Sequence, residues 1–487
     1  MKNIISQAAV FISAVMIFSF PSCHNKEEPK KDAVNYPAAS ETSVVQDAKD
    51  AYLYGFPLVL MHFSERVMTN QASDNKNLPL NRFKNVNRLS EAQFLNVKFW
   101  NFYSFRSYAW VELGREPVVF ELPDTNGRYM LFEIFDGWNN LAASAGSKSA
   151  GTKKQRYLLT APGWNGSVPD GMTQIKIPTE MAYISGGIRV SDSEDGTRFV
   201  LPLQNKLKLI PLSRIDDKTY VPPDLNADKT VDMSDPAEQV FKIDIAEYFN
   251  LLNALMSENP PAADDSGFLE KIRYLNIYPG GEFDLSVFDE RTQEEFKKIP
   301  QWAKDRLSEL SAKKDFTGGW SYSDDKRIYG ADYLKRALSA FGSVGANSSD
   351  NAVSAICVFD SEGNNLNGTN KYAIHFDKDS YPPENTFWSF AVYNSDGAPV
   401  KTAAGRSSGI SYDSEAGINK NIPADIYISV KPPAKGSKNN WLYVPAENFV
   451  IVFRLYPGKD AEVSKNWKLP PVVKMNSDAA SNTKANK

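Results

Sequence analysis

Residues 127–140, GRYMLFEIFDGWNN, have the pattern of a strand that ends in a cluster of polar and aromatic groups. Apolar side chains occupy both alternating faces from Tyr129 to Phe135, which is typical of a strand buried in the middle of a sheet. A turn follows at once, with an aspartate, a glycine, a tryptophan and two asparagines. Polar groups that converge at a strand end often line pockets, so this turn is a candidate site; an ordinary turn beneath an aromatic side chain is the alternative.

Short strands are expected on both sides of a charged, helical middle segment. From residue 94 to 212, apolar runs alternate with Gly, Pro, Asn and Asp, and evenly spaced strands of this kind favour a sandwich or barrel. The strand pattern returns after residue 346. The expected strands cover residues 108–113, 118–122, 128–135, 156–160, 173–177, 181–186 and 206–210, then 353–359, 371–376, 386–393, 425–430 and 449–456.

Helices are expected at residues 46–70, 236–258, 294–310 and 331–341. Gly55, Phe56 and Pro57 should break or kink the first of them, because a proline inside a helix removes one backbone hydrogen bond. The pattern as a whole predicts an α+β fold, mostly β, with two β-sandwich-like domains bridged by a helical segment.

The ends of the chain differ in composition from the expected domains. Lys2, the apolar run at 4–20 and small Ser22 before Cys23 resemble a bacterial lipoprotein signal, in which the cysteine becomes the lipidated first residue. The 487 residues divide into six expected segments: a lipoprotein-like signal peptide at 1–23, a flexible tether at 24–46, an N-terminal helix with a β-rich domain at 47–215, a helical bridging segment at 216–346, a C-terminal β-rich domain at 347–474 and a disordered tail at 475–487.

This signal predicts a lipoprotein of the bacterial outer membrane, with the lipid on Cys23 as its contact with the membrane. Exposure at the cell surface is one outcome; without lipidation the protein would be periplasmic or secreted. Once Cys23 is consumed by lipid, Cys357 is the one cysteine left, which excludes an intrachain disulfide. The net charge of -4 gives no basic surface for nucleic acid.

Polar and aromatic side chains supply the candidates for catalysis and binding. Tyr103 and Asp136 can form an acid/base pair, with a phenol and a carboxyl group that exchange protons with a substrate. Aromatic faces stack on sugars and other flat ligands, while amide and guanidinium groups fix hydroxyls or carboxylates. The expected ligand-binding residues are Asn101, Arg106, Trp138, Asn139 and Trp388. The alternative is that these aromatic residues belong to the core between the sheets.

An acidic segment between residues 224 and 235 has the spacing of a calcium loop. Calcium prefers oxygen ligands at alternate positions, which the loop offers at Asp224, Asn226, Asp228, Thr230, Asp232 and Asp235. Lys229 stands where such a loop expects glycine. The alternative is an acidic linker in which Asp235 caps the helix that begins at Pro236. Calcium, if bound, would be structural.

Residues 405–409, GRSSG, fit the G-x-S-x-G motif of serine hydrolases. A nucleophile elbow requires a strand before the serine and a helix after it. The flanking residues predict a loop instead, and His375 is the nearest histidine that a catalytic triad could use. We therefore do not expect a serine nucleophile here.

Several motifs, in the same order along the chain, carry a resemblance to two bacterial families of unknown function. In the N-terminal part they are AYLYGFPLV at 51–59, EPVVFELPD at 116–124, the 127–140 stretch, YLLTAPGWNG at 157–166 and LQNKLKLIPLS at 203–213. In the C-terminal part they are DYLKRAL at 332–338, YPPENTFWSFAVYN at 381–394, NWLYVP at 440–445 and FRLYP at 453–457. The first part resembles the family numbered 1254, and the second part resembles the family numbered 1214.

The resemblance implies two β-rich, sandwich-like domains bridged by helices, often in envelope or secreted proteins, and it brings no settled activity. One stretch departs from it: where the family has Asn-x-Asp-Thr-x-Tyr-Ser before the first strand, this chain has NFYSFRS at 101–107. Asn101 matches, but the Asp-Thr step is absent. An acid/base or metal role of that aspartate would be lost or moved in this chain.

Three hypotheses of function follow. The first is a lipid-anchored envelope protein that binds a small or oligomeric ligand, such as a glycan, in a pocket lined by Tyr103, Asp136, Trp138 and Asn139. The second is a hydrolase or lyase acting on an envelope or dietary polymer. The third is an assembly protein that forms homo-oligomers. No cofactor is expected apart from structural calcium, because the chain has no phosphate-binding glycine motif.

Overall fold

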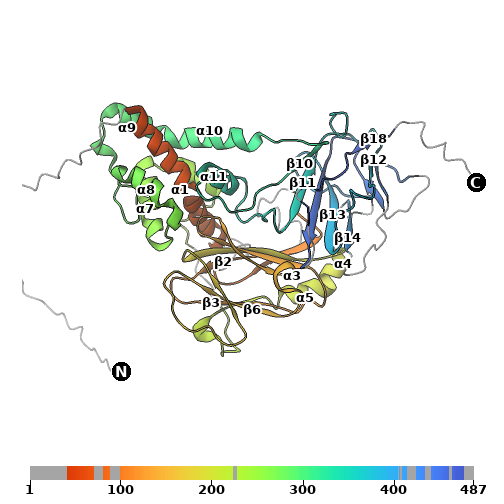
Figure 1. Ribbon diagram of the computed structural model, residues 1–487, viewed down its shortest axis with the longest axis horizontal. Coiled ribbons are helices and arrows are strands. Elements are labelled where there is room, and N and C mark those ends of the chain that lie inside the picture. The colour runs from red at the N-terminus through yellow and green to blue at the C-terminus, as the bar shows by residue number, and fades with distance from the viewer. Residues whose placement is uncertain are drawn as a thin grey trace, which may run out of the picture. The chain divides into compact units, whose positions relative to one another are not determined.

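Four β-sheets and a group of helices make up the described part of the chain in the computed structural model (Figure 1). The structure describes residues 41–70, 80–87, 99–222, 228–403, 405, 408–413, 424–433, 440–459, 463–464 and 466–475. The expected signal peptide with Cys23, most of the tether and nearly all of the tail lie outside these residues. None of the described helices is long and apolar enough to cross a membrane.

The N-terminal β-region consists of two sheets packed face to face. The larger sheet is antiparallel with strand order β1-β2-β8-β4-β5, and the smaller one has the order β7-β6-β3-β9. Phe120 and Leu159 of the smaller sheet meet Phe132 and Ile184 of the larger one in a common core. The strands are β1 (Lys84–Val86), β2 (Ser104–Glu112), β3 (Val118–Leu122), β4 (Met130–Asp136), β5 (Leu141–Gly146), β6 (Gln155–Thr160), β7 (Thr173–Lys176), β8 (Met181–Arg189) and β9 (Lys208–Pro211).

The C-terminal β-region repeats this architecture. One sheet has the order β10-β11-β17-β13-β14 and the other the order β16-β15-β12-β18. Phe390 and Phe453 of the first sheet share a core with Ile374 and Ile428 of the second. The strands are β10 (Trp320–Tyr322), β11 (Val353–Cys357), β12 (Tyr372–His375), β13 (Thr386–Tyr393), β14 (Gly409–Asp413), β15 (Asp425–Ser429), β16 (Trp441–Tyr443), β17 (Val450–Pro457) and β18 (Val473–Lys474). The expected mostly-β α+β fold with bridging helices is confirmed.

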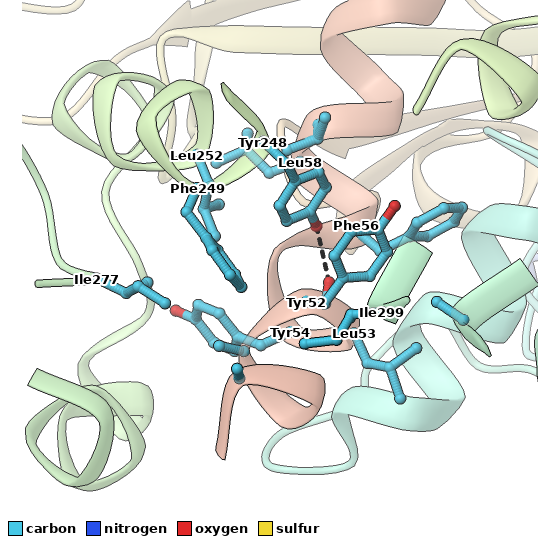
Figure 2. Close-up of a cluster of buried hydrophobic side chains, with 14 of the residues drawn as sticks. Tyr52, Leu53, Tyr54, Phe56, Leu58, Tyr248, Phe249, Leu252, Ile277 and Ile299 are labelled. Carbon is cyan, nitrogen blue, oxygen red and sulfur yellow. Dashed lines mark hydrogen bonds between the residues drawn. The ribbon is translucent and has the colours of Figure 1, made fainter. Parts of the chain in front are cut away.

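Between the two β-regions the chain forms helices that pack around α1 (Glu41–Thr69). Residues 51–61 of α1 are buried, so this helix is surrounded along its middle. In Figure 2 the ring of Tyr248 lies on that of Tyr52, 4.0 Å between centroids, and its hydroxyl donates to the Tyr52 carbonyl at 2.7 Å. The surrounding helices are α6 (Pro236–Lys242), α7 (Ile245–Glu258), α8 (Ser266–Ile272), α9 (Glu290–Lys297), α10 (Ile299–Ala312) and α11 (Tyr333–Gly342); short turns α3 (Ser147–Ala150), α4 (Ser193–Asp195) and α5 (Leu201–Gln204) belong to the N-terminal β-region.

Two helix predictions were wrong in detail. Of the break or kink expected at Gly55–Pro57, the break is absent, because α1 continues through Pro57. The buried surroundings of the helix offset the lost hydrogen bond. The kink stays a prediction. The single helix expected at 236–258 is two helices, since Ile243 is extended and the Asp244 side chain caps α7 by accepting from the Ala246 N–H. The cap of α6 by Asp235 agrees with the sequence pattern.

A buried ion pair joins the helices to the turn after β4. Arg336 of α11 lies 3.6 Å from Asp265, and both side chains are almost fully buried. The guanidinium lies over three aromatic rings, those of Tyr54, Trp138 and Tyr333, at 4.9 to 5.2 Å from their centroids. Removing one partner of such a pair typically costs about 3–5 kcal/mol, because the other charge stays buried. Through its contact with the Trp138 ring, the paired guanidinium also packs the turn 136–140 against the helical core.

A buried carboxyl group joins the segment after α11 to β4. Glu133 is fully buried and accepts from the backbone N–H of Ser348 at 3.0 Å and from the Asn351 amide at 2.8 Å. Burial raises the pKa of Glu133 to about 7. The two hydrogen bonds, and the positive charges of Arg106 and Arg327, act in the opposite direction and lower this pKa. Glu133 is therefore a proton-sensitive contact at the entry to β11.

The contact of α1 with α7 depends on a glycine. A Cβ atom at Gly55 would lie 2.3 Å from Cδ2 of Leu252, which is fully buried. We predict that Gly55→Ala lowers the free energy of unfolding by about 1–3 kcal/mol, as overpacking does. The control is Gly267→Ala in α8, where a Cβ meets nothing within 4 Å; it should be neutral or stabilising by up to about 1 kcal/mol. Urea unfolding measures both, and equal stability of Gly55→Ala and wild type would contradict the packing.

The pKa of Glu133 makes stability depend on pH. The pKa of Glu133 is about 7 in the folded protein and 4.5, its ordinary value, in the unfolded chain. The protonated group therefore contributes its full stabilisation below pH 4.5, and this contribution is lost as the pH rises through about 7. We predict that the stability of wild type relative to Glu133→Gln falls by about 3 kcal/mol between pH 4.5 and 8. Urea unfolding at both pH values tests this, with the exposed Glu362→Gln as control. A difference between wild type and Glu133→Gln that does not change with pH would overturn the assignment.

Candidate functional site

A narrow cleft lies where the larger N-terminal sheet meets the first C-terminal sheet. Strands β2, β4 and β8 supply one wall, and β13 and β17 supply the other. The cleft holds about 10 Å³, which is room for roughly one water molecule. A space of this size admits a small chemical group and does not enclose a larger molecule. The lining residues are Ser104, Arg106, Tyr129, Leu131, Gly187, Arg189, Phe387 and Tyr456.

Strand register brings the first wall together. Arg106 of β2 and Leu131 of β4 are both paired with Gly187 of β8, and Ser104 is paired with Arg189. Side chains at paired positions point to the same face of a sheet, so these groups form one row across three strands. A Cβ atom at Gly187 would lie 2.3 Å from the Ser104 hydroxyl and 3.2 Å from Cδ of Arg106. Glycine at position 187 therefore makes room for both neighbouring side chains.

Arg106 is held in place by neutral groups. Its Nη2 donates to the Ser185 hydroxyl at 2.8 Å and to the Asn347 side-chain oxygen at 3.4 Å. Burial alone would lower the pKa of Arg106, but Tyr108, Tyr456 and Glu133 outweigh it and raise that pKa above its ordinary value. The guanidinium therefore stays charged at the cleft.

The second wall is aromatic. The rings of Phe387 and Tyr456 are stacked, with centroids 5.6 Å apart and an interplanar angle of 11°, and Tyr129 lies 5.6 Å from Tyr456. Arg189 lies over the Phe387 ring at 5.4 Å. The Asn101 amide donates to the Tyr456 hydroxyl oxygen at 2.9 Å, which leaves the hydrogen of that hydroxyl available as a donor. The cleft thus combines cationic and hydroxyl donors with flat apolar surfaces.

Three of the residues singled out in the sequence lie at this junction. Arg106 lines the cleft, Asn101 orients Tyr456, and Tyr103 packs in the same buried cluster as Tyr129 and Tyr456. The side-chain oxygen of Asn101 also accepts from the Tyr103 backbone N–H at 3.0 Å. Burial raises the pKa of the Tyr103 phenol well above its ordinary value, so this hydroxyl stays protonated.

The turn after β4 lies at the other end of the strand. The Tyr103 carbonyl accepts a hydrogen bond from the Val190 N–H, just beyond the end of β8. Asp136 is paired with Ala182, which precedes Val190 by eight residues along the chain. That spacing corresponds to about 26 Å. The structure therefore does not bring Tyr103 and Asp136 together, and these two side chains cannot share one proton-transfer step.

The polar groups of the turn are used to shape it. Asp136 accepts from the backbone N–H groups of Trp138 and Asn140, both at 2.9 Å, and burial raises its pKa. The Trp138 indole donates to the Asn259 carbonyl at 3.2 Å, and the Asn139 side-chain oxygen accepts from the Gly345 N–H. Asn139 adopts a left-handed φ of 61°, which asparagine tolerates. Most polar groups of the turn are thus engaged within the protein, while Nδ2 of Asn139 is buried without a partner among the described residues. Ligand binding at this turn stays a prediction.

The remaining candidates are placed as follows. Trp388 is 2% exposed and stacks on Tyr412 at 4.2 Å in the C-terminal core. In the acidic segment, Asp228 accepts from Thr230, Asp232 from the Ser234 N–H, and Asp235 caps α6. Asp224, Asn226 and the motif serine Ser407 lie outside the described residues. No group of three His, Cys, Asp or Glu side chains among the residues described could hold a metal ion; calcium binding stays a prediction.

The sequence analysis missed Arg189, Glu133 and Tyr456. Arg189 and Glu133 are charged residues within or at the end of runs of apolar residues, MAYISGGIR and MLFEIFD. A charge in a strand that is buried on both faces requires a polar partner, and that pattern is visible in the sequence. Tyr456 carries no such signal, because β17 is aromatic and apolar throughout apart from Arg454.

Comparison with known proteins agrees with the motifs. Residues 80–211 match the family described as protein of unknown function DUF1254, and residues 351–460 match that described as DUF1214. The curated proteins contain no match.

Two solved structures are similar to the chain. The VPA0106 protein from Vibrio parahaemolyticus is 21% identical over 89% of this chain and 100% of its own, with a TM-score of 0.66, and so has the same fold. A putative uncharacterized protein from Burkholderia cenocepacia is 11% identical over 90% of this chain and 96% of its own, with a TM-score of 0.37. The N-terminal and C-terminal segments of the chain thus match the models of two families of unknown function, DUF1254 and DUF1214, in the order that the sequence motifs indicate.

Proposed function

We propose that this protein is a lipid-anchored component of the bacterial cell envelope that binds a small ligand in the cleft between its two β-regions. The observation that carries the proposal is the cleft itself. A guanidinium from β2 faces a stacked tyrosine and phenylalanine from β17 and β13 across a space that a small group can enter. Clefts at the boundary of two domains, with few polar groups on apolar walls, are common ligand sites.

The residues that line the cleft come from both segments that match a family model. Strands β2, β4 and β8 belong to the DUF1254 segment, while β13 and β17 belong to the DUF1214 segment. A site that needs residues from both segments gives one physical reason for the two to occur in one chain.

The N-terminal sequence supports the envelope location. A lysine, an apolar run and Ser22 directly before Cys23 have the order of a lipoprotein signal. Such an anchor would hold the β-regions near the membrane without a membrane-spanning helix.

Binding is favoured over acid/base catalysis by the separation of Tyr103 and Asp136. Glu133 has a raised pKa, which is a common property of catalytic carboxyls, but it is not among the residues that line the cleft. The described groups that face the cleft are therefore suited to holding a ligand and lack a placed proton acceptor.

Ligand binding should depend on Arg106. We predict that a ligand found by NMR screening of small metabolites and glycan fragments against the mature chain binds Arg106→Gln at least tenfold more weakly than wild type, equivalent to about 1.4 kcal/mol. The reason is the loss of a charged, forked donor.

The matched control is Arg115→Gln, which removes the same charge at a side chain that is 91% exposed. Affinity should not change in this variant. Hits whose affinity is equal in both variants would show that the cleft is not the binding site.

Lipidation should depend on Cys23. We predict that the wild-type protein partitions into the membrane fraction, with a lipid mass on residue 23 by mass spectrometry, and that Cys23→Ser abolishes both. Cys357→Ser serves as the control, because Cys357 is fully buried in β11. An unmodified mature protein in the soluble fraction would overturn the anchor.

A further inference from the structure

We infer that the cleft takes the carboxylate group of a small organic acid, with Arg106 as the anion anchor and the Tyr456–Phe387 pair as the surface for the rest of the ligand. This inference rests on the proposed function, because it names the ligand class of the same site. Three observations support it: the polar groups at the cleft are mainly donors, the space is small, and two stacked aromatic rings line it.

The polar groups at the cleft are mainly donors. Arg106 is held by Ser185 and Asn347, which orient the guanidinium without neutralising it. The Tyr456 hydroxyl accepts from Asn101 and keeps its own hydrogen to donate. Of the described residues that line the cleft, two are arginines and none is acidic. A site of this kind favours an acceptor with negative charge over a neutral hydroxyl or amide.

The carboxyl group of Glu133, which acts electrostatically on Arg106, is already engaged. Glu133 accepts from the Ser348 N–H and the Asn351 amide, and it lies two residues beyond Leu131 on the same face of β4. Its hydrogen bonds therefore point to the segment after α11. An incoming anion would not have to displace a direct ion pair between Glu133 and Arg106.

Size selects among anions. The cleft has room for roughly one water molecule, so it suits the end of a planar carboxylate better than a tetrahedral phosphate or sulfate, which presents three or four oxygens. The planar guanidinium pairs with a carboxylate through two parallel hydrogen bonds.

The aromatic wall suggests what the carboxylate is attached to. The rings of Phe387 and Tyr456 are stacked on each other and line the cleft, and the ring of Tyr129 lies beside them at an angle of 48° to that of Tyr456. Flat rings contact other flat or apolar groups favourably. An aromatic or short-chain monocarboxylate satisfies both parts of the site, with its apolar part at the mouth of the cleft.

Matched probes test this inference on the mature chain. Calorimetry or NMR titration with benzoate, benzamide, benzyl alcohol and inorganic phosphate separates charge from shape. We expect saturable binding of benzoate, at least tenfold weaker binding of benzamide and benzyl alcohol, and no competition by phosphate at equal concentration. Arg106→Gln should weaken benzoate at least tenfold, and Arg106→Lys should restore part of the affinity, because it returns the charge without the fork.

A second variant keeps the test valid if Arg106→Gln does not fold. Tyr456→Phe removes one hydroxyl donor and keeps the stacked ring, so it should weaken benzoate about threefold to tenfold and leave benzyl alcohol unchanged. Circular dichroism and urea unfolding establish that each variant is folded.

The outcomes separate this inference from the proposed function. If neutral ligands bind, their affinity depends on Arg106, and the affinity for benzoate is no higher than that for benzamide, the carboxylate class is wrong. The cleft would then still be the ligand site. Phosphate that competes as well as benzoate would overturn the class in the same way. No Arg106-dependent binding of any acid or library compound would overturn both.

Discussion

The larger N-terminal sheet is buried on both faces, and the rest of the structure depends on this constraint. One face of β4, with Met130, Phe132 and Ile134, packs against the smaller sheet. The opposite face meets three different neighbours in turn. Phe135 lies by α1 in a cluster with Met61, Glu133 binds the segment after α11, and Leu131 packs against Phe387 and Tyr456 of the C-terminal sheet. A single strand thus holds the helices, the linker and the second β-region together.

Polar groups on this second face have to be satisfied where water is scarce. At the middle of the strand the carboxylate of Glu133 takes two donors, and on β2 the guanidinium of Arg106 takes two neutral acceptors. At the end of β8 nearest the C-terminal sheet, Gly187 has no side chain and so leaves space beside Ser104 and Arg106 of β2. The cleft arises at this point, where the apolar contact of the two β-regions gives way to a row of polar side chains.

Periodicity in the sequence predicted most of the elements, because the buried strands are apolar and long. Val118–Leu122 and Thr386–Tyr393 have the expected bounds, and the middle segment is helical. The start of β2 was missed: the serines and Arg106 interrupt the apolar alternation, although they are paired with β8. A local pattern does not contain the partner strand that makes those positions strand-like.

The site was harder to predict than the fold, because it is assembled from distant parts of the chain. Asn101 and Arg106 were identified as polar residues near an expected strand. Their neighbours Phe387 and Tyr456 follow much later in the chain, with Tyr456 lying 355 positions after Asn101. The turn at Asp136 carried the stronger local signal. The carboxylate of Asp136 and the indole of Trp138 are used in hydrogen bonds within the turn and to the helices, whereas Nδ2 of Asn139 is buried without a partner among the described residues. No spacing rule distinguishes such a turn from a ligand site.

The most direct test of this account is a crystal structure of the mature chain grown with benzoate. The account predicts electron density for the ligand between Arg106 and Tyr456, with both carboxylate oxygens within hydrogen-bond distance of the guanidinium. Density for the ligand at the 136–140 turn, or an ordered cleft without ligand at saturating benzoate, would contradict it.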